Sequence, residues 1–216
     1  MKLDRDCYGT MALAWIIGIA LILLLHSLMP AGIVFYILTA VILVFSCFVT
    51  WFHRVPNRQP VGEANQITSV ADGKVVIIEK VFEPEYLKKE CIQVSVYMNF
   101  FDVHANFWPL SGEISYYKYH PGKHILAFYP KSSELNEHSS SAIKNSYGEI
   151  FFKQIAGTFA RRIVCYSKVG NTTEKGKQMG IIKFGSRIDM FLPLDASIAV
   201  NVEDLTRACE TVICKL

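Results

Sequence analysis

The sequence lacks the short motifs by which many metal, redox and hydrolase sites are recognised. Its six cysteines form no C-x-x-C pair and no spacing typical of a zinc site. It has no G-x-S-x-G segment, which argues against the nucleophile elbow of α/β hydrolases. Internal repeats and heptads are absent too, which argues against solenoids and coiled coils. We therefore expect free thiols in a reducing compartment and no bound metal.

A strong charge of one sign is also missing. Residues 1–52 hold two basic and two acidic residues, so the remainder has 20 basic against 17 acidic residues. This small excess, without aromatic residues interleaved among the basic ones, argues against a nucleic-acid partner. A net charge of +3 suits a domain that works near anionic lipid.

Two apolar runs near the N-terminus account for much of the 51% hydrophobic content. Residues 11–28 contain no acidic residue, Lys or Arg, and residues 33–52 form a second run after a Pro/Gly break. At about 1.5 Å per helical residue, each run approaches the roughly 30 Å of a bilayer's hydrocarbon core. We predict a transmembrane helical hairpin within an anchor of residues 1–52. The alternative is a signal peptide followed by one anchor, but no A-x-A cleavage site follows the first run.

Basic residues predict the orientation of this hairpin. Lys2 and Arg5 precede it, Arg54 and Arg58 follow it, and the connecting turn has no basic residue. By the positive-inside rule, both ends of the hairpin lie in the cytoplasm. We therefore expect the C-terminal domain on the cytoplasmic face of the cell membrane.

Residues 53–216 consist of short apolar runs rich in Val, Ile, Tyr and Phe. Gly, Pro, Asn or Asp interrupts them roughly every 10 residues, which predicts a mainly β barrel or sandwich. The polar stretch 132–146 is predicted to be a long loop. The candidate strands are 74–81, 91–98, 112–119, 149–155, 161–169, 180–192, 197–202 and 210–215.

Three segments carry residue types that support catalysis. Asp72 lies in an Ala-Asp-Gly segment, which is a common turn sequence, and His104 lies among aromatic residues, as core histidines often do. Ser186 follows Gly185 between two strand-like runs, a common place for a turn or bulge. An acid, a base and a nucleophile are the parts of a catalytic triad, yet their order in the chain does not show that they meet. Asp102 is a further candidate partner for the imidazole.

Longer segments resemble one enzyme family over about residues 50–216. In order and spacing they are similar to those of the short bacterial and archaeal phosphatidylserine decarboxylase proenzymes. The combination of QIAG-x-x-ARRI with FGSR is the most specific part of this resemblance. The matching segments are SVADGKVV at 69–76, FFDVHANFWPLSGEI at 100–114, PGKHILA at 121–127, LNEHSS at 135–140, QIAGTFARRIVC at 154–165 and GIIKFGSRIDMFLP at 180–193.

The resemblance implies a self-cleaving, pyruvoyl-dependent decarboxylase. Ser186 would attack the carbonyl of Gly185, and β-elimination from the resulting ester would convert the serine into a pyruvoyl group. Cleavage would leave a β chain of residues 1–185 and an α chain of residues 186–216, which stay associated. The implied substrate is phosphatidylserine in the membrane, whose serine amine would form a Schiff base with the pyruvoyl ketone and then lose carbon dioxide.

The same resemblance assigns roles to other residues. His104, in the family's VH-x-N motif, and Asp72, in its ADG motif, would activate the serine. His104 would also supply a proton during decarboxylation. Asn106, Arg161 and Arg162 are candidates for binding the substrate's carboxylate or phosphate, and a structural ion pair is an equal alternative for the two arginines.

The chain departs from the family's pattern at three positions. Phe107 stands where relatives commonly carry Arg or His, so a charged or titratable group is missing there. Val70 replaces the Pro of SPADG, and His138 replaces a usual Arg.

Other functions stay open on the sequence alone. They are a pyruvoyl-dependent decarboxylase of a soluble amino acid, a membrane-anchored serine hydrolase that uses Ser186, and a non-catalytic β-barrel scaffold. The predicted hairpin favours a lipid substrate, because a soluble amino acid would need no anchor. A homo-oligomer is compatible with each of these functions.

Overall fold

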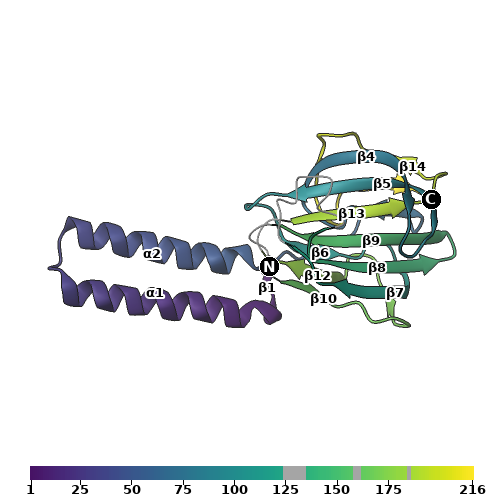
Figure 1. The fold of residues 1–216 in the computed structure, drawn as a ribbon. Helices are drawn as coiled ribbons and strands as arrows, with labels where there is room; N and C mark the ends of the chain where they lie inside the picture. The colour runs from purple at the N-terminus through teal and green to yellow at the C-terminus, as the bar shows by residue number, and fades with distance from the viewer. Residues whose placement is uncertain (124–134, 158–161, 184–185) are drawn as a thin grey trace. The chain divides into compact units, whose positions relative to one another are not determined.

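The computed structural model describes the chain except for residues 124–134, 158–161 and 184–185 (Figure 1). The chain divides into two compact units, Met1–Pro56 and Asn57–Leu216. Each unit has its own secondary structure, helical in the first and β in the second.

The first unit contains two apolar helices that form a hairpin. Helix α1 spans Tyr8–Leu28 and helix α2 spans Ile33–Phe52. Gly18 allows them to pack closely, because a Cβ at this position would lie 2.8 Å from the hydroxyl oxygen of Ser46 on α2. Most of their large apolar side chains are exposed, and both helices are long and apolar enough to cross a membrane. The predicted pair of apolar helices is confirmed, and it suggests membrane anchoring.

A short strand pair joins the two ends of this hairpin. Strand β1 (Lys2–Leu3) pairs antiparallel with β2 (Arg54–Val55), and a 3-10 turn, η1 (Arg5–Cys7), leads into α1. The first unit therefore extends beyond residue 52, because β2 is hydrogen-bonded to the N-terminal strand.

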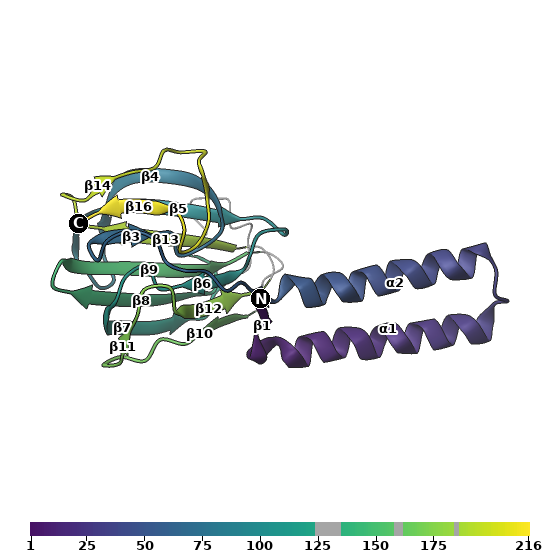
Figure 2. The ribbon, with the colours of Figure 1, turned by 180° about the vertical axis from the view of Figure 1, so that it is seen from behind.

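The second unit is almost entirely β, which confirms the predicted fold class. Its main sheet is curled and has the antiparallel strand order β11-β7-β8-β9-β13-β5-β4-β15 (Figure 2). Two three-stranded sheets, β10-β12-β6 and β14-β16-β3, complete it. The strands are β3 (Gln66–Thr68), β4 (Gly73–Glu83), β5 (Lys89–Met98), β6 (Ala105–Phe107), β7 (Gly112–His120), β8 (His138–Asn145), β9 (Gly148–Ala156), β10 (Ile163–Cys165), β11 (Thr172–Thr173), β12 (Gln178–Ile182), β13 (Ser186–Leu192), β14 (Ser197–Ile198), β15 (Leu205–Thr206) and β16 (Val212–Lys215).

Strand β13 lies inside the main sheet and is buried on both faces. Ile188 and Met190 belong to the main apolar core, to which the main sheet and both small sheets contribute. Arg187 and Asp189 point to the opposite face, because successive side chains of a strand alternate. Both are fully buried, and Arg187 Nε lies 2.8 Å from Asp189 Oδ1. The strand thus places an apolar layer on one side and an ion pair on the other.

The polar stretch 132–146, predicted to be a long loop, contains a strand, and its first residues, 132–134, lie outside the described residues. Residues 138–145 form strand β8 within the main sheet. Its serines are buried because their hydroxyls have partners: Ser139 Oγ donates to Gln154 Oε1 (2.7 Å), and Ser141 Oγ lies 2.9 Å from Ser167 Oγ. Polarity in this stretch therefore reflects hydrogen bonding inside the fold.

The predicted strand over 180–192 is also corrected, because it consists of two strands in different sheets. Strand β12 belongs to a three-stranded sheet, whereas β13 belongs to the main sheet. The change of sheet occurs between Ile182 and Ser186, which is where the FGSR segment of the sequence lies.

We predict that Gly73, the first residue of β4, does not tolerate a side chain. Its φ is +148°, and a Cβ there would overlap the carbonyl oxygen of Tyr97 on the neighbouring strand. Gly73→Ala should lower the free energy of unfolding by more than about 2 kcal/mol, since strained backbone and overlap add up. Denaturant unfolding of the full chain in detergent measures this loss.

Gly170→Ala is the matched control. Its φ is +85°, but apart from its chain neighbours no atom lies within 4 Å of the added Cβ. The substitution should therefore lower the free energy of unfolding only by the backbone cost of about 1–2 kcal/mol. Equal losses for the two variants would contradict the predicted overlap with Tyr97.

Candidate functional site

Ser186 is the first residue of the central strand β13. It pairs with Met98 of β5 on one side and with Ala156 of β9 on the other. Its side chain is fully buried, and its Oγ donates a hydrogen bond to Met98 Sδ at 3.5 Å. A thioether sulfur is a weak acceptor, so this contact positions the hydroxyl without holding its proton strongly. Gly185 lies outside the described residues.

His104 lies at the end of the turn that precedes β6 and is fully buried. Its Nδ1 is 3.1 Å from the backbone carbonyl oxygen of Asp102. Because a carbonyl oxygen only accepts, Nδ1 of the neutral ring carries the proton and Nε2 carries the lone pair that a general base needs. The His104 carbonyl accepts from Ile182 N–H at 3.2 Å, which joins this segment to β12 shortly before Ser186.

Asp102, the second candidate partner of the imidazole, also has a local structural role. Its Oδ2 accepts from the N–H of Asn99 at 2.8 Å, and the Asn99 side chain accepts from Phe101 N–H at 2.8 Å. These bonds close a tight turn after β5. The turn fixes the carbonyl that contacts His104.

Asn106 is brought close to the candidate nucleophile. Its Nδ2 lies 3.8 Å from Met98 Sδ, the same sulfur that Ser186 Oγ approaches. Its Oδ1 accepts from Gln154 Nε2 at 2.8 Å, and Gln154 in turn accepts from Ser139 Oγ. This chain fixes the amide orientation, so an N–H donor is directed toward the surroundings of Ser186.

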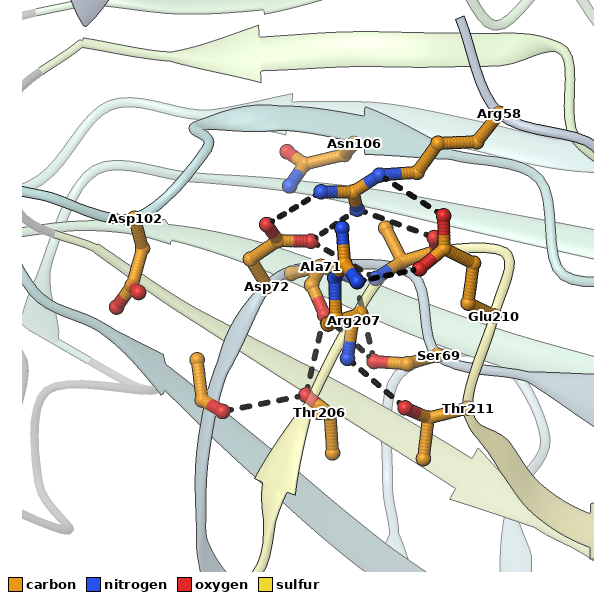
Figure 3. A network of polar contacts seen from close by, with 12 residues as sticks. Arg58, Ser69, Ala71, Asp72, Asp102, Asn106, Thr206, Arg207, Glu210 and Thr211 are labelled. Atoms are coloured by element: carbon orange, nitrogen blue, oxygen red, sulfur yellow. Dashed lines mark hydrogen bonds and ion pairs between the residues drawn. The ribbon is translucent and has the colours of Figure 1, made fainter. Parts of the chain in front are cut away.

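Asp72 lies in the loop between β3 and β4, and its carboxylate is bound by Arg58 (Figure 3). Arg58 Nη2 donates to Oδ2 at 2.8 Å, Nη1 donates to Oδ1, and Ala208 N–H donates to Oδ1 at 2.9 Å. The hydrogen bonds to Asp72 raise the pKa of Arg58 above its ordinary value. Among the described residues, no hydrogen bond joins Asp72 to His104, so the predicted pairing of these two side chains stays a prediction.

The loop that carries Asp72 packs against β6. Phe107 N–H donates to the carbonyl oxygen of Val70 at 2.9 Å, and both side chains are buried. Val70 and Phe107 are two of the positions at which the chain departs from the family pattern, and here they are neighbours. The same hydrogen bond connects the Asp72 loop to the strand that carries Asn106.

Sequence reasoning missed the roles of Arg58 and of the buried Arg187–Asp189 pair. Arg58 Nη1 also donates to Ala208 O at 3.1 Å, and its Nε lies 3.5 Å from Glu210 Oε1. Its partners lie far from it in the sequence, so no local spacing indicates them. For Arg187 and Asp189, the sequence did offer a signal. Residues i and i+2 of a strand point to the same face, so the predicted strand already placed the two side chains side by side.

Of the two arginines predicted to bind the substrate, the structure describes only Arg162. Arg161 lies outside the described residues. Arg162 is exposed, and its carbonyl oxygen accepts from Lys183 N–H at 3.2 Å. Arg162 is thus hydrogen-bonded to the segment that leads to Ser186.

A buried serine and a buried histidine, on segments joined through β12, supply the side-chain types of an enzyme that acts through its serine. Comparison with known proteins identifies the family: the model for phosphatidylserine decarboxylase matches residues 45–214. This chain belongs to the phosphatidylserine decarboxylase family, as its motifs predict.

Individual relatives show how far the similarity extends. A phosphatidylserine decarboxylase proenzyme of Amoebophilus asiaticus is 47% identical over 170 residues, which are 78% of this chain and 76% of that protein. A proenzyme of Cytophaga hutchinsonii is 44% identical over 166 residues, 76% of each chain. A proenzyme of Porphyromonas gingivalis is 36% identical over 219 residues, 100% of this chain and 99% of that protein. The last match includes the helical hairpin.

We predict that Arg58 is required to keep the Asp72 loop in place. Their side chains are only 7% and 12% exposed, so Arg58→Met would leave a largely buried carboxylate without its charged partner. Breaking such a pair costs about 3–5 kcal/mol of unfolding free energy. Denaturant unfolding in detergent measures this loss.

Lys74→Met provides the control, because it removes an ion pair with Glu203 whose side chains are 44% and 69% exposed. Loss of this surface pair should cost less than about 1 kcal/mol. Adding Asp72→Asn to Arg58→Met should cost less than the sum of the single changes. Strict additivity would show that the two side chains do not act as a pair.

Proposed function

We propose that this chain is a membrane-anchored phosphatidylserine decarboxylase that cuts itself between Gly185 and Ser186. Enzymes of this family are pyruvoyl-dependent carboxy-lyases whose pyruvoyl group derives from a serine. The observation that carries the proposal is the position of Ser186, which follows the FG of the family motif and begins the central strand in a fully buried setting. A serine hydrolase that acted through Ser186 would keep a single chain, whereas the proposed reaction cuts it.

Self-cleavage requires a base for the serine hydroxyl. His104 is the proposed base, since its Nδ1 faces a carbonyl oxygen and its Nε2 therefore accepts a proton. Attack of Ser186 Oγ on the Gly185 carbonyl would replace the amide by an ester, with the proton passing to the former amide nitrogen. β-Elimination, in which a base removes the Cα proton of Ser186, would then release the carboxylate of Gly185. Water would add to the resulting imine, release that nitrogen as ammonia and supply the ketone oxygen. Burial of Ser186 keeps bulk water from the ester before elimination.

The residues around Ser186 fit the group that would form there. The pyruvoyl group supplies an electron sink for the pair left behind by carbon dioxide. Asn106 Nδ2, which approaches the same sulfur as Ser186 Oγ, would supply a hydrogen-bond donor near this group. His104 is proposed to supply the proton that replaces carbon dioxide on the product. Phosphatidylethanolamine and carbon dioxide are the proposed products.

Asp72 is proposed to support His104 through the backbone as a positioning residue. Arg58 and Ala208 N–H hold its carboxylate, and its loop is bonded to β6 through Val70 O and Phe107 N–H. Strand β6 follows His104 directly. Displacement of the loop would therefore shift the segment that carries the base.

The segment 186–216 has the contacts to remain bound after cleavage. It supplies β13, which pairs with both β5 and β9, and β15 and β16, which pair with β4 and β3. The Arg58–Glu210 ion pair adds a contact between the two proposed chains. We therefore propose a stable complex of a β chain, 1–185, and an α chain, 186–216.

For the substrate, we propose that Asn106, Arg161 and Arg162 contribute to binding the headgroup of phosphatidylserine. An exposed guanidinium such as that of Arg162 suits a carboxylate or a phosphate. The chain carries no feature that favours a nucleic-acid partner.

We also propose that both ends of the hairpin face the cytoplasm. Pairing of β1 with β2 holds the two ends side by side, with Lys2 and Arg54 on the paired strands. The Arg54 guanidinium carbon lies 3.4 Å from the centre of the Trp51 ring. Trp and Arg are frequent at the border between lipid and cytoplasm.

Ser186→Ala tests the proposed chemistry. Without the hydroxyl no ester forms, so the variant should stay a single 24.4 kDa chain and should lose decarboxylation. The wild type should show two chains, the smaller one without a free N-terminal amine. Intact-mass spectrometry checks both outcomes, and hydroxylamine trapping detects the carbonyl group.

His104→Ala should likewise block cleavage. Ser197→Ala, which changes an exposed serine of the segment 186–216, is the control and should leave cleavage unchanged. Decarboxylation by the uncut Ser186→Ala protein would show that another cofactor is used. Normal cleavage of His104→Ala would remove His104 from the role of base.

Topology is tested separately. A reporter fused after Leu216 should report the cytoplasm, because the positive-inside rule places the ends of the hairpin there. Deletion of residues 1–52 should release the β unit from membranes, since those apolar helices are the proposed attachment. A reporter signal from the opposite side would contradict the proposed orientation, and persistent membrane binding of the deleted form would contradict the anchor.

A further inference from the structure

Two histidines face each other across the edge of the main sheet, at a distance from the cleavage motif in the sequence. His120 at the end of β7 is directly opposite His138 at the start of β8. Their rings are stacked, with centroids 4.3 Å apart and planes inclined by 12°. Glu85, from the turn between β4 and β5, places its Oε1 at 2.7 Å from His120 Nε2.

We propose that Glu85, His120 and His138 form a binding site for a divalent transition metal of the zinc class. One ligand atom from each residue lies within 4.8 Å of the other two. Two imidazoles and a carboxylate are a ligand set that zinc accepts, with water in the fourth position. At metal–ligand distances of about 2.1 Å, tetrahedral ligand atoms lie about 3.4 Å apart. Side-chain rotations that move the ligand atoms by about an ångström would therefore bring them to the spacing that the metal needs.

The surroundings of the cluster already have the arrangement that a metal site requires. His138 Nδ1 lies 2.7 Å from the carbonyl oxygen of Asn136, so it carries the proton and leaves the Nε2 lone pair for a metal. Glu85 Oε2 accepts from Ser140 Oγ at 3.0 Å and lies 3.0 Å from Lys153 Nζ. These contacts fix the carboxylate with Oε1 directed to His120.

The turn that carries Glu85 is itself fixed by a buried carboxylate. Glu83 is fully buried and accepts hydrogen bonds from the N–H groups of Glu85, Tyr86 and Leu87 at 2.8–2.9 Å. The position of Glu85 therefore does not depend on a metal. A ligand set that is held in place before binding loses less conformational entropy when the metal enters.

The charges of the site favour a cation. Glu83 and Glu85 carry two negative charges, and Lys153, at 3.8 Å and 3.0 Å from them, carries one positive charge. These three side chains together carry one net negative charge, which favours the binding of a cation.

The test uses Co²⁺ as a spectroscopic probe for the zinc class. The full-length protein in detergent is treated with chelator, its accessible thiols are blocked with N-ethylmaleimide, and Co²⁺ is added. We expect visible d–d bands that saturate at one Co²⁺ per chain and disappear when Zn²⁺ is added. Zn²⁺ should also raise the thermal unfolding midpoint, because it binds only the folded state.

Variants assign the site. His120→Gln and His138→Ala should each weaken Co²⁺ binding at least tenfold and remove the rise in unfolding midpoint. Glu113→Gln, on the same strand as His120 but in an exposed ion pair with Lys144, should bind Co²⁺ like the wild type. Ser186→Ala should also bind normally, so the result is independent of self-cleavage.

Two results would overturn the proposal. One is the absence of visible bands and of any rise in the unfolding midpoint at metal concentrations up to about 1 mM, because a Kd above this value does not indicate a specific site. The other is wild-type binding by His120→Gln and His138→Ala, which would place the metal elsewhere. In either case the contact between Glu85 and His120 would be only an ion pair that holds the turn between β4 and β5 against the main sheet.

Discussion

The burial of strand β13 on both faces is the constraint on which the rest of this structure depends. A strand at this position must pair with β5 and β9 and must fill the core on one side. Its first residue is Ser186, so the serine proposed to react is held by the same pairing that organises the sheet. A catalytic group on a central strand is positioned far more rigidly than one on a loop.

Buried polar groups are the second consequence of this arrangement. The face of the sheet opposite the main apolar core contains the Arg187–Asp189 ion pair and Ser140 of β8, whose Oγ donates to Glu85 Oε2 at 3.0 Å. Burying such groups is costly unless each is paired, and here charge partners or hydroxyl partners are present. The Arg58–Asp72 pair follows the same rule in the loop before β4. The Arg58–Asp72 pair fixes the loop before β4, because displacement of that loop would leave both buried charges without their partner.

Sequence patterns predicted the structural features that depend on neighbouring residues. They missed the buried contacts that depend on residues far away in the chain. The apolar runs 11–28 and 33–52 predicted both helices, because hydrophobic length is a local property. The composition of the stretch 132–146 led to the wrong prediction of a loop for the part that forms β8. Its serines are buried because they bond to Gln154 and Ser167, and local composition cannot reveal these partners. The family motifs indicated Asp72, His104 and Ser186, but the partner of Asp72 came from outside them. The fold class and the candidate residues were thus accessible, and the network that holds them was not.

The proposed cleavage separates the anchor from the reactive group. If the bond before Ser186 is cut, the hairpin remains with the β chain and the pyruvoyl group belongs to the α chain. Attachment of the reactive group to the membrane then depends entirely on noncovalent contacts within the β unit. Pairing of β13 on both edges, of β16 with β3 and of β15 with β4 supplies these contacts, and the Arg58–Glu210 ion pair adds to them. In the proposed reaction, the central position of β13 would therefore serve two needs: it would fix the serine before cleavage and retain the new chain end afterwards.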